Sequence, residues 1–385
     1  MHNLQGDSKE RLKEVDIVRG FAVLGICVVN IPEMLGNGVA FESEYTGSNA
    51  LFRLLYDMFI QTKFYTLFAF LFGLSFYLFM RSAERRGFAA KKMMTRRLLL
   101  LLIVGIVHGV LIWFGDVLHV YAILGFILLL FYRRKEKTVL IWSLSLLVLS
   151  GLITVATTLL AILFVPDELS KPIFQTVPDL AQRIGFLLTY STLNIFLKGP
   201  EIAGLFLLGL YAGKKGWFEG NGLSTDRLKW MQWISLSLSI LFFIPMVYYY
   251  VSGSIYNPNY VYHYTFLSGK SMAVFYFCTL MRLIRHPGEQ RFKGLGAVGR
   301  MAFTNYLTQS VITMLILYVF LRQDGSWPLW ICFIYSVLLF WLQAWWSRAW
   351  LRRYRMGPLE WAWRAGTYGY FPSLREKPAE LKQAE

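Results

Sequence analysis

The sequence predicts an all-α integral membrane protein, a bundle of about ten transmembrane helices with both termini in the cytoplasm. Of its 385 residues, 56% are hydrophobic and only 16% are charged, against roughly 25% charged residues in an average soluble domain. Apolar stretches of about 17–25 residues recur along the chain, which is the length that crosses a bilayer core. Lys and Arg outnumber Asp and Glu by 39 to 23, and the positive residues cluster between the apolar stretches.

Ten of these stretches are predicted to be transmembrane helices, each bounded to within a few residues. They cover residues 15–35, 62–81, 98–114, 117–132, 138–165, 193–213, 228–251, 266–284, 297–320 and 328–347. The sequence contains no linker, low-complexity tract or recognisable repeat. We therefore predict a single polytopic domain over residues 1–385, with a basic and aromatic cytoplasmic tail at about 348–385.

The distribution of positive charge predicts the orientation. Thirty-one of the 39 Lys and Arg residues fall in alternate segments, namely the N-terminus to residue 14, 81–97, 133–137, 214–229, 282–300 and 348–385. Such an excess marks cytoplasmic loops, so both termini are predicted to be cytoplasmic and the number of crossings to be even. The net charge of +16 is thus explained by positive residues at the cytoplasmic face of the lipid bilayer. The bilayer is the expected partner, and no nucleic acid is expected.

The first predicted helix carries a polar stripe. Asp16, Arg19, Asn30 and Glu33 fall within an arc of about 100° on an otherwise apolar helix. Arg19 and Asp16 can pair near the cytoplasmic end, and Asn30 lies about 16 Å farther along, in the outer half. Ionisable residues inside a membrane are costly, so they are candidates for a functional site. The alternative is a structural hydrogen bond between helices.

Residues 98–132 must hold two crossings, and the pair Gly115-Asp116 is the turn signal between them. Each arm is about 16 residues, or about 24 Å, which is shorter than the roughly 30 Å core. The turn is therefore predicted to stop below the outer surface. Asp116 and His119 would then lie in a recess, with His108 near the midplane. The alternative is that these groups only cap a tight turn.

The sixth predicted span, 193–213, contains Gly199 and Pro200, and we predict that the helix breaks there. Lys198 and Glu201 flank the predicted break. A broken helix is tolerated at membrane depth where it lines a cavity.

Residues 294–299 read GLGAVG, the letters of a dinucleotide-binding turn, but no predicted strand precedes them, so that site is rejected. The helix start followed by Arg300 could still hold a phosphate. Lys63 and Lys270 lie at outer helix ends, where snorkelling explains them as well as a site does. The sequence contains no metal-binding motif, so no metal is expected.

Five motifs together give the chain a family resemblance. They are VDIVRGFAVLGICVVNI (15–31), RRLLLLLIVGIVHGVLIWFGDVLHVYAILG (96–125), KGPEIAGLFLLGLYAGKKG (198–216), LGAVGRMAFTNYLTQS (295–310) and GPLEWAWRAGTYG (357–369). The chain resembles the YeiB-like family of bacterial integral membrane proteins, a domain of unknown function, over nearly its whole length. This resemblance implies a multi-pass protein of the bacterial cell membrane.

The chain is also distantly similar to transmembrane acyltransferases, namely the acyltransferase-three group and the lysosomal heparan glucosaminide acetyltransferases. Both carry an Arg-Gly near the start of helix one, followed eleven residues after the Arg by His in the first group and Asn in the second. Arg19 and Asn30 match this spacing. The second group uses a His shortly after its Asn, whereas here the next histidine is His108.

The similarity implies an acyltransferase that moves an acyl group from a cytoplasmic acyl-CoA to an acceptor at the outer face. His119 or His108 would be the general base, with Asp116 orienting it, because imidazole exchanges protons near neutral pH. Asn30 would donate to the developing oxyanion.

In this hypothesis Arg19 and Arg300 would meet the phosphates of coenzyme A at the cytoplasmic mouth. Lys198, Glu201 and Glu33 would line the substrate cavity. The alternative function is a transporter or exporter of a small solute or a lipid-like molecule, which a polar recess and a broken helix suit equally well.

Overall fold

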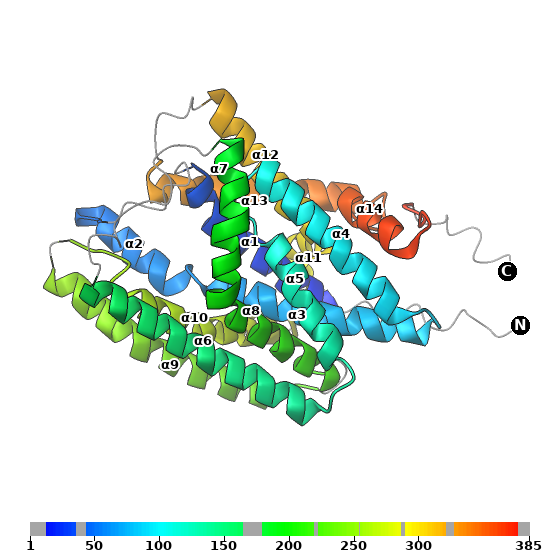
Figure 1. Ribbon diagram of the computed structural model, residues 1–385, viewed down its shortest axis with the longest axis horizontal. Coiled ribbons are helices and arrows are strands. Elements are labelled where there is room, and N and C mark those ends of the chain that lie inside the picture. The colour runs from blue at the N-terminus through cyan, green and yellow to red at the C-terminus, as the bar shows by residue number, and fades with distance from the viewer. Residues whose placement is uncertain are drawn as a thin grey trace, which may run out of the picture.

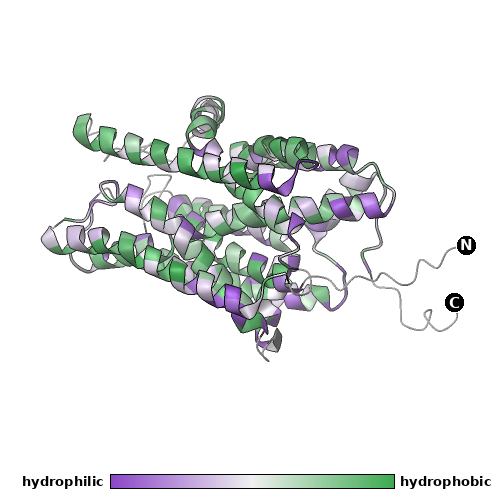
Figure 2. Cartoon of the chain, turned by 90° about the horizontal axis from the view of Figure 1, so that it is seen from below, coloured by the Kyte–Doolittle hydropathy of each residue, from purple (hydrophilic) through white to green (hydrophobic). Residues whose placement is uncertain are grey.

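The computed structural model describes residues 13–35, 44–164, 179–218, 222–253, 255–285, 289–320 and 327–375. In these ranges the chain is almost entirely helical and contains no β-strand, only two isolated bridges. The helices lie side by side in one bundle (Figure 1), and the hydropathy colouring shows long apolar helices with hydrophilic residues toward one end (Figure 2). The predicted all-α bundle is confirmed.

The helices follow one another along the chain without long insertions in the described ranges. They are α1 Lys13–Leu35, α2 Gly47–Phe59, α3 Lys63–Arg85, α4 Ala90–Leu111, α5 Leu118–Phe131, α6 Glu136–Phe164, α7 Leu180–Gly185, the π-helix η2 Phe186–Tyr190, α8 Ser191–Lys214, α9 Thr225–Ser252, α10 Tyr262–Arg285, the 3-10 helix η3 Glu289–Phe292, α11 Lys293–Arg300, α12 Ala302–Phe320, α13 Leu329–Leu351 and α14 Pro358–Tyr368.

Eight helical stretches in the described part are long and apolar enough to cross a membrane, so the protein is a multi-pass membrane protein. They are α1, the continuous pair α2–α3, α4, α6, most of α8, α9, α12 and α13. The two other predicted spans coincide with α5, which has only 14 residues, and with α10, which carries Lys270 and several polar side chains. The orientation of the bundle in the membrane stays a prediction.

Helix α1 is the central helix of the bundle. In its most apolar window 72% of residues are buried, against 11% for α6. It packs against α3, α10, α11, α12 and α13. Large apolar side chains of α6, such as Leu152 and Leu163, are exposed, as expected for a helix that faces lipid. The polar stripe of α1 is therefore directed into protein and not into the bilayer.

The GLGAVG motif serves close helix packing. It lies inside α11, where a Cβ on Gly299 would come within 1.8 Å of the Asp16 carbonyl oxygen. A Cβ on Gly20 of α1 would come within 1.9 Å of the Leu295 carbonyl oxygen. Only glycine allows two helix backbones to approach this closely. The motif thus brings α11 onto α1, in agreement with the rejection of a dinucleotide site.

The predicted break at Pro200 is wrong, because α8 continues through this residue. Proline removes one backbone hydrogen-bond donor, and a helix often bends at this point instead of ending. Figure 1 shows this bend: α7 and the first part of α8 run across the bundle, and the rest of α8 turns to run with its neighbours. The second part packs between α3 and α6.

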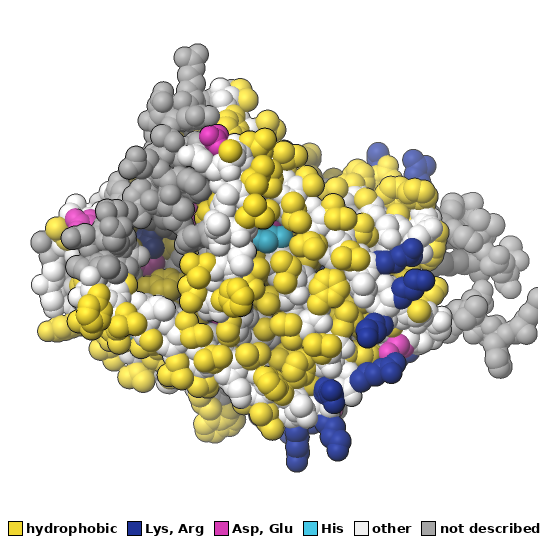
Figure 3. Space-filling view, in the orientation of Figure 1, with side chains coloured by type: hydrophobic (Ala, Val, Ile, Leu, Met, Phe, Trp, Pro, Cys, Tyr) yellow, Lys and Arg dark blue, Asp and Glu magenta, His cyan; other side chains and the backbone are white. Residues whose placement is uncertain are grey.

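The C-terminal helix α14 folds back onto the bundle, against α4 and α12. The Glu360 carboxylate accepts hydrogen bonds from the backbone N–H groups of Phe303 and Thr304, at 2.8 and 3.0 Å, and so caps the start of α12. The described part of the predicted tail is therefore docked. Figure 3 shows Lys and Arg side chains gathered at this end of the bundle, beside an otherwise largely hydrophobic face.

Candidate functional site

The carboxylate of Asp116, in the turn between α4 and α5, is the centre of a buried polar cluster. Its Oδ1 lies 3.1 Å from His108 Nδ1 and accepts a 2.9 Å hydrogen bond from the Tyr306 hydroxyl. Its Oδ2 accepts a 2.9 Å bond from the Leu118 backbone N–H and lies 3.8 Å from His119 Nδ1. Three helices, α4, α5 and α12, thus position one carboxylate and two imidazoles.

This cluster is enclosed by protein. The Asp116 side chain is 0% exposed, and those of His108 and His119 are 2% and 6% exposed. A buried carboxylate is stable only with close partners, and the N–H and O–H groups around Asp116 supply them. None of the four imidazole nitrogens forms a regular hydrogen bond with a described residue, and all four are buried. The Nδ1 atom of each ring faces the Asp116 carboxylate at ion-pair distance, and the Nε2 atom faces no polar partner among the described residues.

One glycine of α4 lets α5 begin at this position. A Cβ on Gly105 would lie 2.4 Å from the His119 backbone nitrogen, so any larger residue would push α5 away. The predicted turn at 115–116 is confirmed, and Gly105 explains how the turn brings His119 back toward His108.

A second buried cluster surrounds Glu201 on α8. Its carboxylate forms an ion pair with the ammonium of Lys270 on α10 and accepts a 2.6 Å hydrogen bond from the Tyr65 hydroxyl. The ammonium of Lys270 thus turns inward to a carboxylate. Tyr121 of α5 interacts electrostatically with both Glu201 and Tyr306, and Tyr306 bonds to Asp116. The two clusters are therefore neighbours.

The other predicted cavity residues adjoin these clusters. Glu33 of α1 interacts electrostatically with Lys198 and Arg53, and Lys198 is exposed. Asn30 lies one helical turn from Ile26, whose side chain packs in the same apolar cluster as Leu118 and Tyr306. Asn30 is half-buried.

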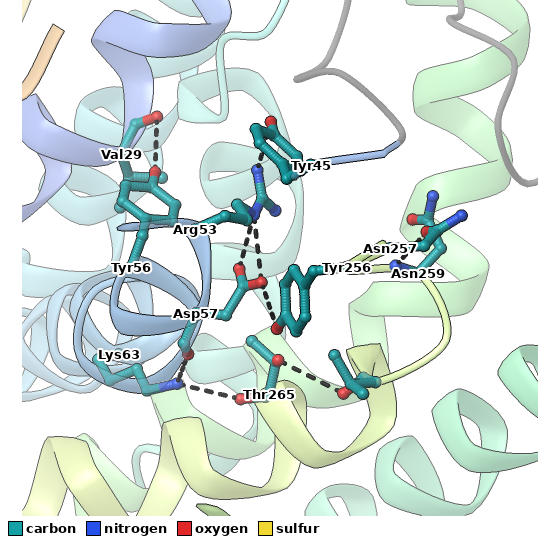
Figure 4. A network of polar contacts seen from close by, with 11 residues as sticks. Val29, Tyr45, Arg53, Tyr56, Asp57, Lys63, Tyr256, Asn257, Asn259 and Thr265 are labelled. Atoms are coloured by element: carbon teal, nitrogen blue, oxygen red, sulfur yellow. Dashed lines mark hydrogen bonds and ion pairs between the residues drawn. The ribbon is translucent and has the colours of Figure 1, made fainter. Parts of the chain in front are cut away.

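Arg53 and Asp57 of α2 centre a third polar network (Figure 4). The Arg53 guanidinium bonds to Asp57 Oδ2 at 3.1 Å and to the Tyr45 hydroxyl at 3.5 Å, and the Tyr256 hydroxyl donates to Asp57 Oδ2 at 3.0 Å. Burial, together with the neighbouring Asp57 carboxylate, raises the pKa of Tyr256, so this hydroxyl keeps its proton and donates. The network joins α2 to the segment between α9 and α10.

Lys63 belongs to this network and not to the membrane interface. Its ammonium is fully buried and donates to the Asp57 carbonyl oxygen at 2.6 Å, to Ser268 Oγ at 3.1 Å and to the Thr265 carbonyl oxygen at 3.4 Å. The snorkelling interpretation of Lys63 is therefore wrong. The ammonium instead fastens the start of α3 to α10.

At the opposite end of α1, Arg19 is held by three partners. Its guanidinium pairs with Asp16 at 2.9 Å, donates to Ser75 Oγ at 3.0 Å and donates to the Gly299 carbonyl oxygen at 3.3 Å. The guanidinium of Arg300 donates instead to the Arg355 carbonyl oxygen at 2.9 Å.

Arg97 of α4 brings further positive charge to this end. Its guanidinium lies 3.7 Å from the ring centroid of Trp363 and 4.9 Å from that of Phe79. It interacts electrostatically with Arg364 and Arg19, which carry the same charge, and with Glu360, which carries the opposite charge. In the described part of the chain Arg97 forms no ion pair. Like charges held together raise the free energy unless an anion joins them.

The comparisons with known proteins agree with the fold. A family model described as "Protein of unknown function (DUF418)" matches residues 212–370. YxaH of Bacillus subtilis (strain 168) is 32% identical over 96% of this chain and 97% of its own length. The chain belongs to the YeiB-like (DUF418) family. YeiB of Escherichia coli (strain K12) is 26% identical over 92% of this chain and 96% of its own.

A second family model matches the first half of this YeiB-like chain. It is described as "Heparan-alpha-glucosaminide N-acetyltransferase, catalytic" and covers residues 11–178, which include α1 to α6. The matched range holds six of the predicted site residues: Arg19, Asn30, Glu33, His108, Asp116 and His119. Glu201 and Tyr306 lie outside it.

Several residues of the site were not predicted from the sequence. Tyr306, Tyr65 and Arg97 gave no signal, because a tyrosine in an apolar helix or an arginine in a basic loop is ordinary. Lys270 did give a signal as a charge within a predicted span, but its partner Glu201 lies on another helix. In this YeiB-like chain the tertiary packing assembles both clusters.

Proposed function

We propose that this protein is a membrane-embedded acyltransferase of the bacterial cell membrane. It would move an acyl group from a cytoplasmic acyl-CoA to a hydroxyl or amine presented at the outer face. The observation that carries the proposal is the buried pair of His108 Nδ1 and Asp116 Oδ1, 3.1 Å apart, with the other imidazole nitrogen unpartnered among the described residues. The match of an acetyltransferase family model over both residues supports it.

In the proposed reaction His108 is the general base. Its Nε2 takes the proton of the acceptor hydroxyl or amine while the Asp116 carboxylate stabilises the imidazolium that forms. Such proton transfer contributes roughly 10²–10⁴-fold to the rate. His119 stands 3.8 Å from the same carboxylate, a longer contact, and so takes the second place as candidate base.

The donor would bind at the basic end of the bundle. Arg97 and His108 are eleven residues apart on α4, which places them on one face about 16 Å from each other. Arg19 and Asn30 have the same spacing on α1, and Arg19 lies near Arg97. Arginines suit phosphate groups because their N–H donors match phosphate oxygens. The pantetheine arm of the donor would span this interval and carry the acyl group to the imidazole.

The acceptor would approach from the side of the Glu201 cluster. Glu201 and Glu33 offer carboxylates, and Lys198 offers an exposed ammonium. Asn30 is proposed to orient the acceptor or to donate to the acyl oxygen. These groups suit a polar acceptor with several hydroxyl or amine groups.

The second candidate is a transporter or exporter of a small solute or lipid-like molecule. The bend of α8 beside the ion pair of buried Glu201 and half-buried Lys270 favours it, because bent helices with charges inside the bundle line transport sites in membranes. A transporter would need no base, so the imidazole–carboxylate pair would be expendable.

One assay separates the two candidates without knowledge of the acceptor. Purified protein in lipid nanodiscs is mixed with acetyl-CoA or a longer acyl-CoA, and water takes the place of the unknown acceptor. Two quantities are measured: the binding of the thioester, and the free coenzyme A thiol that hydrolysis of the thioester releases. An acyltransferase binds the thioester and releases thiol slowly, and His108→Gln abolishes the release but keeps the binding. Absence of binding or of thiol release in the wild-type protein would overturn the acyltransferase proposal.

A further inference from the structure

Trp113, between α4 and the Asp116 turn, has a buried indole N–H without a hydrogen-bond partner among the described residues. This is unlike other indoles of the same chain. The Nε1 atoms of four tryptophans donate hydrogen bonds of 2.7–3.2 Å, namely Trp346, Trp350, Trp361 and Trp363. A buried donor without a partner costs free energy, so the exception calls for an acceptor that is not a protein side chain.

Ser310 of α12 is a second exception. Buried hydroxyls on membrane helices usually donate to the carbonyl oxygen one turn earlier. Ser336 does so to Cys332 at 2.6 Å, and Ser239 does so to Ser235 at 2.8 Å. The Oγ of Ser310 is buried and has no partner in the part of the chain that the structure describes.

Both groups border the Asp116 cluster. The Trp113 indole lies against Gly115, where a Cβ would be 2.7 Å from the indole Cε2, the atom bonded to Nε1. Ser310 lies one turn after Tyr306, which bonds to Asp116. It also lies one turn before Met314, which packs in the same apolar cluster as Trp113.

Unpartnered polar atoms therefore collect around one turn. Trp113 Nε1 and Ser310 Oγ can donate, and the Nε2 atoms of His108 and His119 can accept a proton. Acyl transfer requires both hydrogen-bond donors and a base, because the attacked carbonyl oxygen becomes negative as the attacking atom loses its proton.

We infer that the indole N–H of Trp113 and the hydroxyl of Ser310 form a binding subsite for the carbonyl oxygen of an acyl thioester. This inference rests on the proposed acyltransferase function and names the groups that would stabilise its oxyanion. Because the two donors are held by packing in an apolar surrounding, they need little reorganisation when the charge develops.

The acceptor oxygen or nitrogen bonds to the acyl carbon, and its proton passes to the His108 imidazole. The electron pair of the carbonyl double bond moves onto the oxygen, which Trp113 and Ser310 would hold. The oxyanion then reforms the double bond, the carbon–sulfur bond breaks, and the coenzyme A thiolate leaves with the proton from the imidazolium.

The test measures thiol release from acetyl-CoA by the full-length protein in nanodiscs, for Trp113→Phe and Ser310→Ala. Each substitution removes one donor and nearly keeps the shape of the side chain. Losing one such donor is expected to lower kcat by about 10²–10³-fold while the Kd for acetyl-CoA stays within about twofold. Trp142→Phe and Ser145→Ala, on the exposed face of α6, are the matched controls and should keep the wild-type rate.

The outcomes distinguish this inference from the proposed function. A wild-type protein that binds acetyl-CoA and releases thiol, with both variants equally fast, would overturn the subsite alone and leave an ordinary buried water as the partner of the two donors. A wild-type protein that releases no thiol overturns the proposed function, and the subsite with it. The melting temperature of each variant is measured so that a loss of rate is not a loss of folding.

Discussion

Tyr306 donates a 2.9 Å hydrogen bond to Oδ1 of Asp116, the same oxygen that faces Nδ1 of His108. The two residues are 190 positions apart in the chain. Asp116 lies in the range matched by the acetyltransferase family model, and Tyr306 lies in the range matched by the DUF418 model. The two matched parts of the chain therefore meet in one hydrogen bond at the centre of the candidate site.

Changing Tyr306 to Phe should weaken the hold on Asp116 without emptying the space. We expect kcat for thiol release to fall by about 10–100-fold, since a hydrogen bond to a charged group is worth roughly 1.5–3 kcal/mol, and the Kd for acyl-CoA to stay unchanged. Tyr248→Phe, at an exposed position of α9, is the control. An unchanged kcat would show that Tyr306 has no part in positioning the carboxylate.

The two histidines should differ in their effect. His108→Gln is expected to reduce thiol release by at least about 10²-fold, because the base is lost, whereas His119→Gln should lower it less. The reason is the shorter contact of His108 with Asp116, 3.1 Å against 3.8 Å. Steady-state rates and acyl-CoA titrations measure this. If His119→Gln gives the larger loss, the roles of the two rings are reversed.

Arg97→Gln should impair donor binding before it impairs chemistry. Loss of one charge-assisted contact to a phosphate is expected to raise the Kd for acyl-CoA by about 10–100-fold, with little change in kcat at saturation. Arg96→Gln removes the same charge from the exposed neighbouring position and is the control. Equal Kd values for the two variants would rule out a specific phosphate contact at Arg97. A binding isotherm at constant ionic strength provides the readout.

Breaking the pair of Glu201 and Lys270 should destabilise the bundle. Glu201→Gln leaves the Lys270 ammonium without its counter-charge. We expect the free energy of unfolding to fall by up to about 3 kcal/mol. This is the lower end of the range for buried ion pairs, because the Lys270 side chain is 24% exposed. Lys270→Met combined with Glu201→Gln should recover most of this loss. Thermal unfolding in detergent of the two single variants and the double variant forms the cycle. Additive losses would mean that the pair is not coupled.

Cysteine labelling can test the predicted orientation of the bundle in the membrane. Lys91→Cys and Ser252→Cys place one exposed thiol at each end of the bundle, and the native Cys27, Cys278 and Cys332 are buried. A membrane-impermeant maleimide added to intact cells should label Ser252→Cys and leave Lys91→Cys unlabelled until the cells are lysed. Unmodified protein is the control for the buried cysteines. Labelling of both variants from outside would contradict the charge-based topology.

The sequence by itself determined the parts of this protein that depend on neighbouring residues. Membrane spans follow from the local content of apolar side chains, so the helical bundle was predictable. The polar stripe of α1 follows from its helical period. The grouping of His108, Asp116 and His119 follows from a turn between two short helices, because these residues are close in the chain and can meet in few other ways.

The tertiary structure alone decided which helices face one another. The bond from Tyr306 to Asp116 and the pair of Glu201 with Lys270 join helices that are far apart in the chain. Hydropathy does not specify the order and rotation of helices, since many arrangements bury similar apolar area. Close contacts decide them, such as Gly299 against the α1 backbone. The neighbouring helices likewise decided whether Pro200 would break α8 or bend it. Proline removes one backbone hydrogen bond from the helix, and the packing of α8 against its neighbours keeps this segment helical.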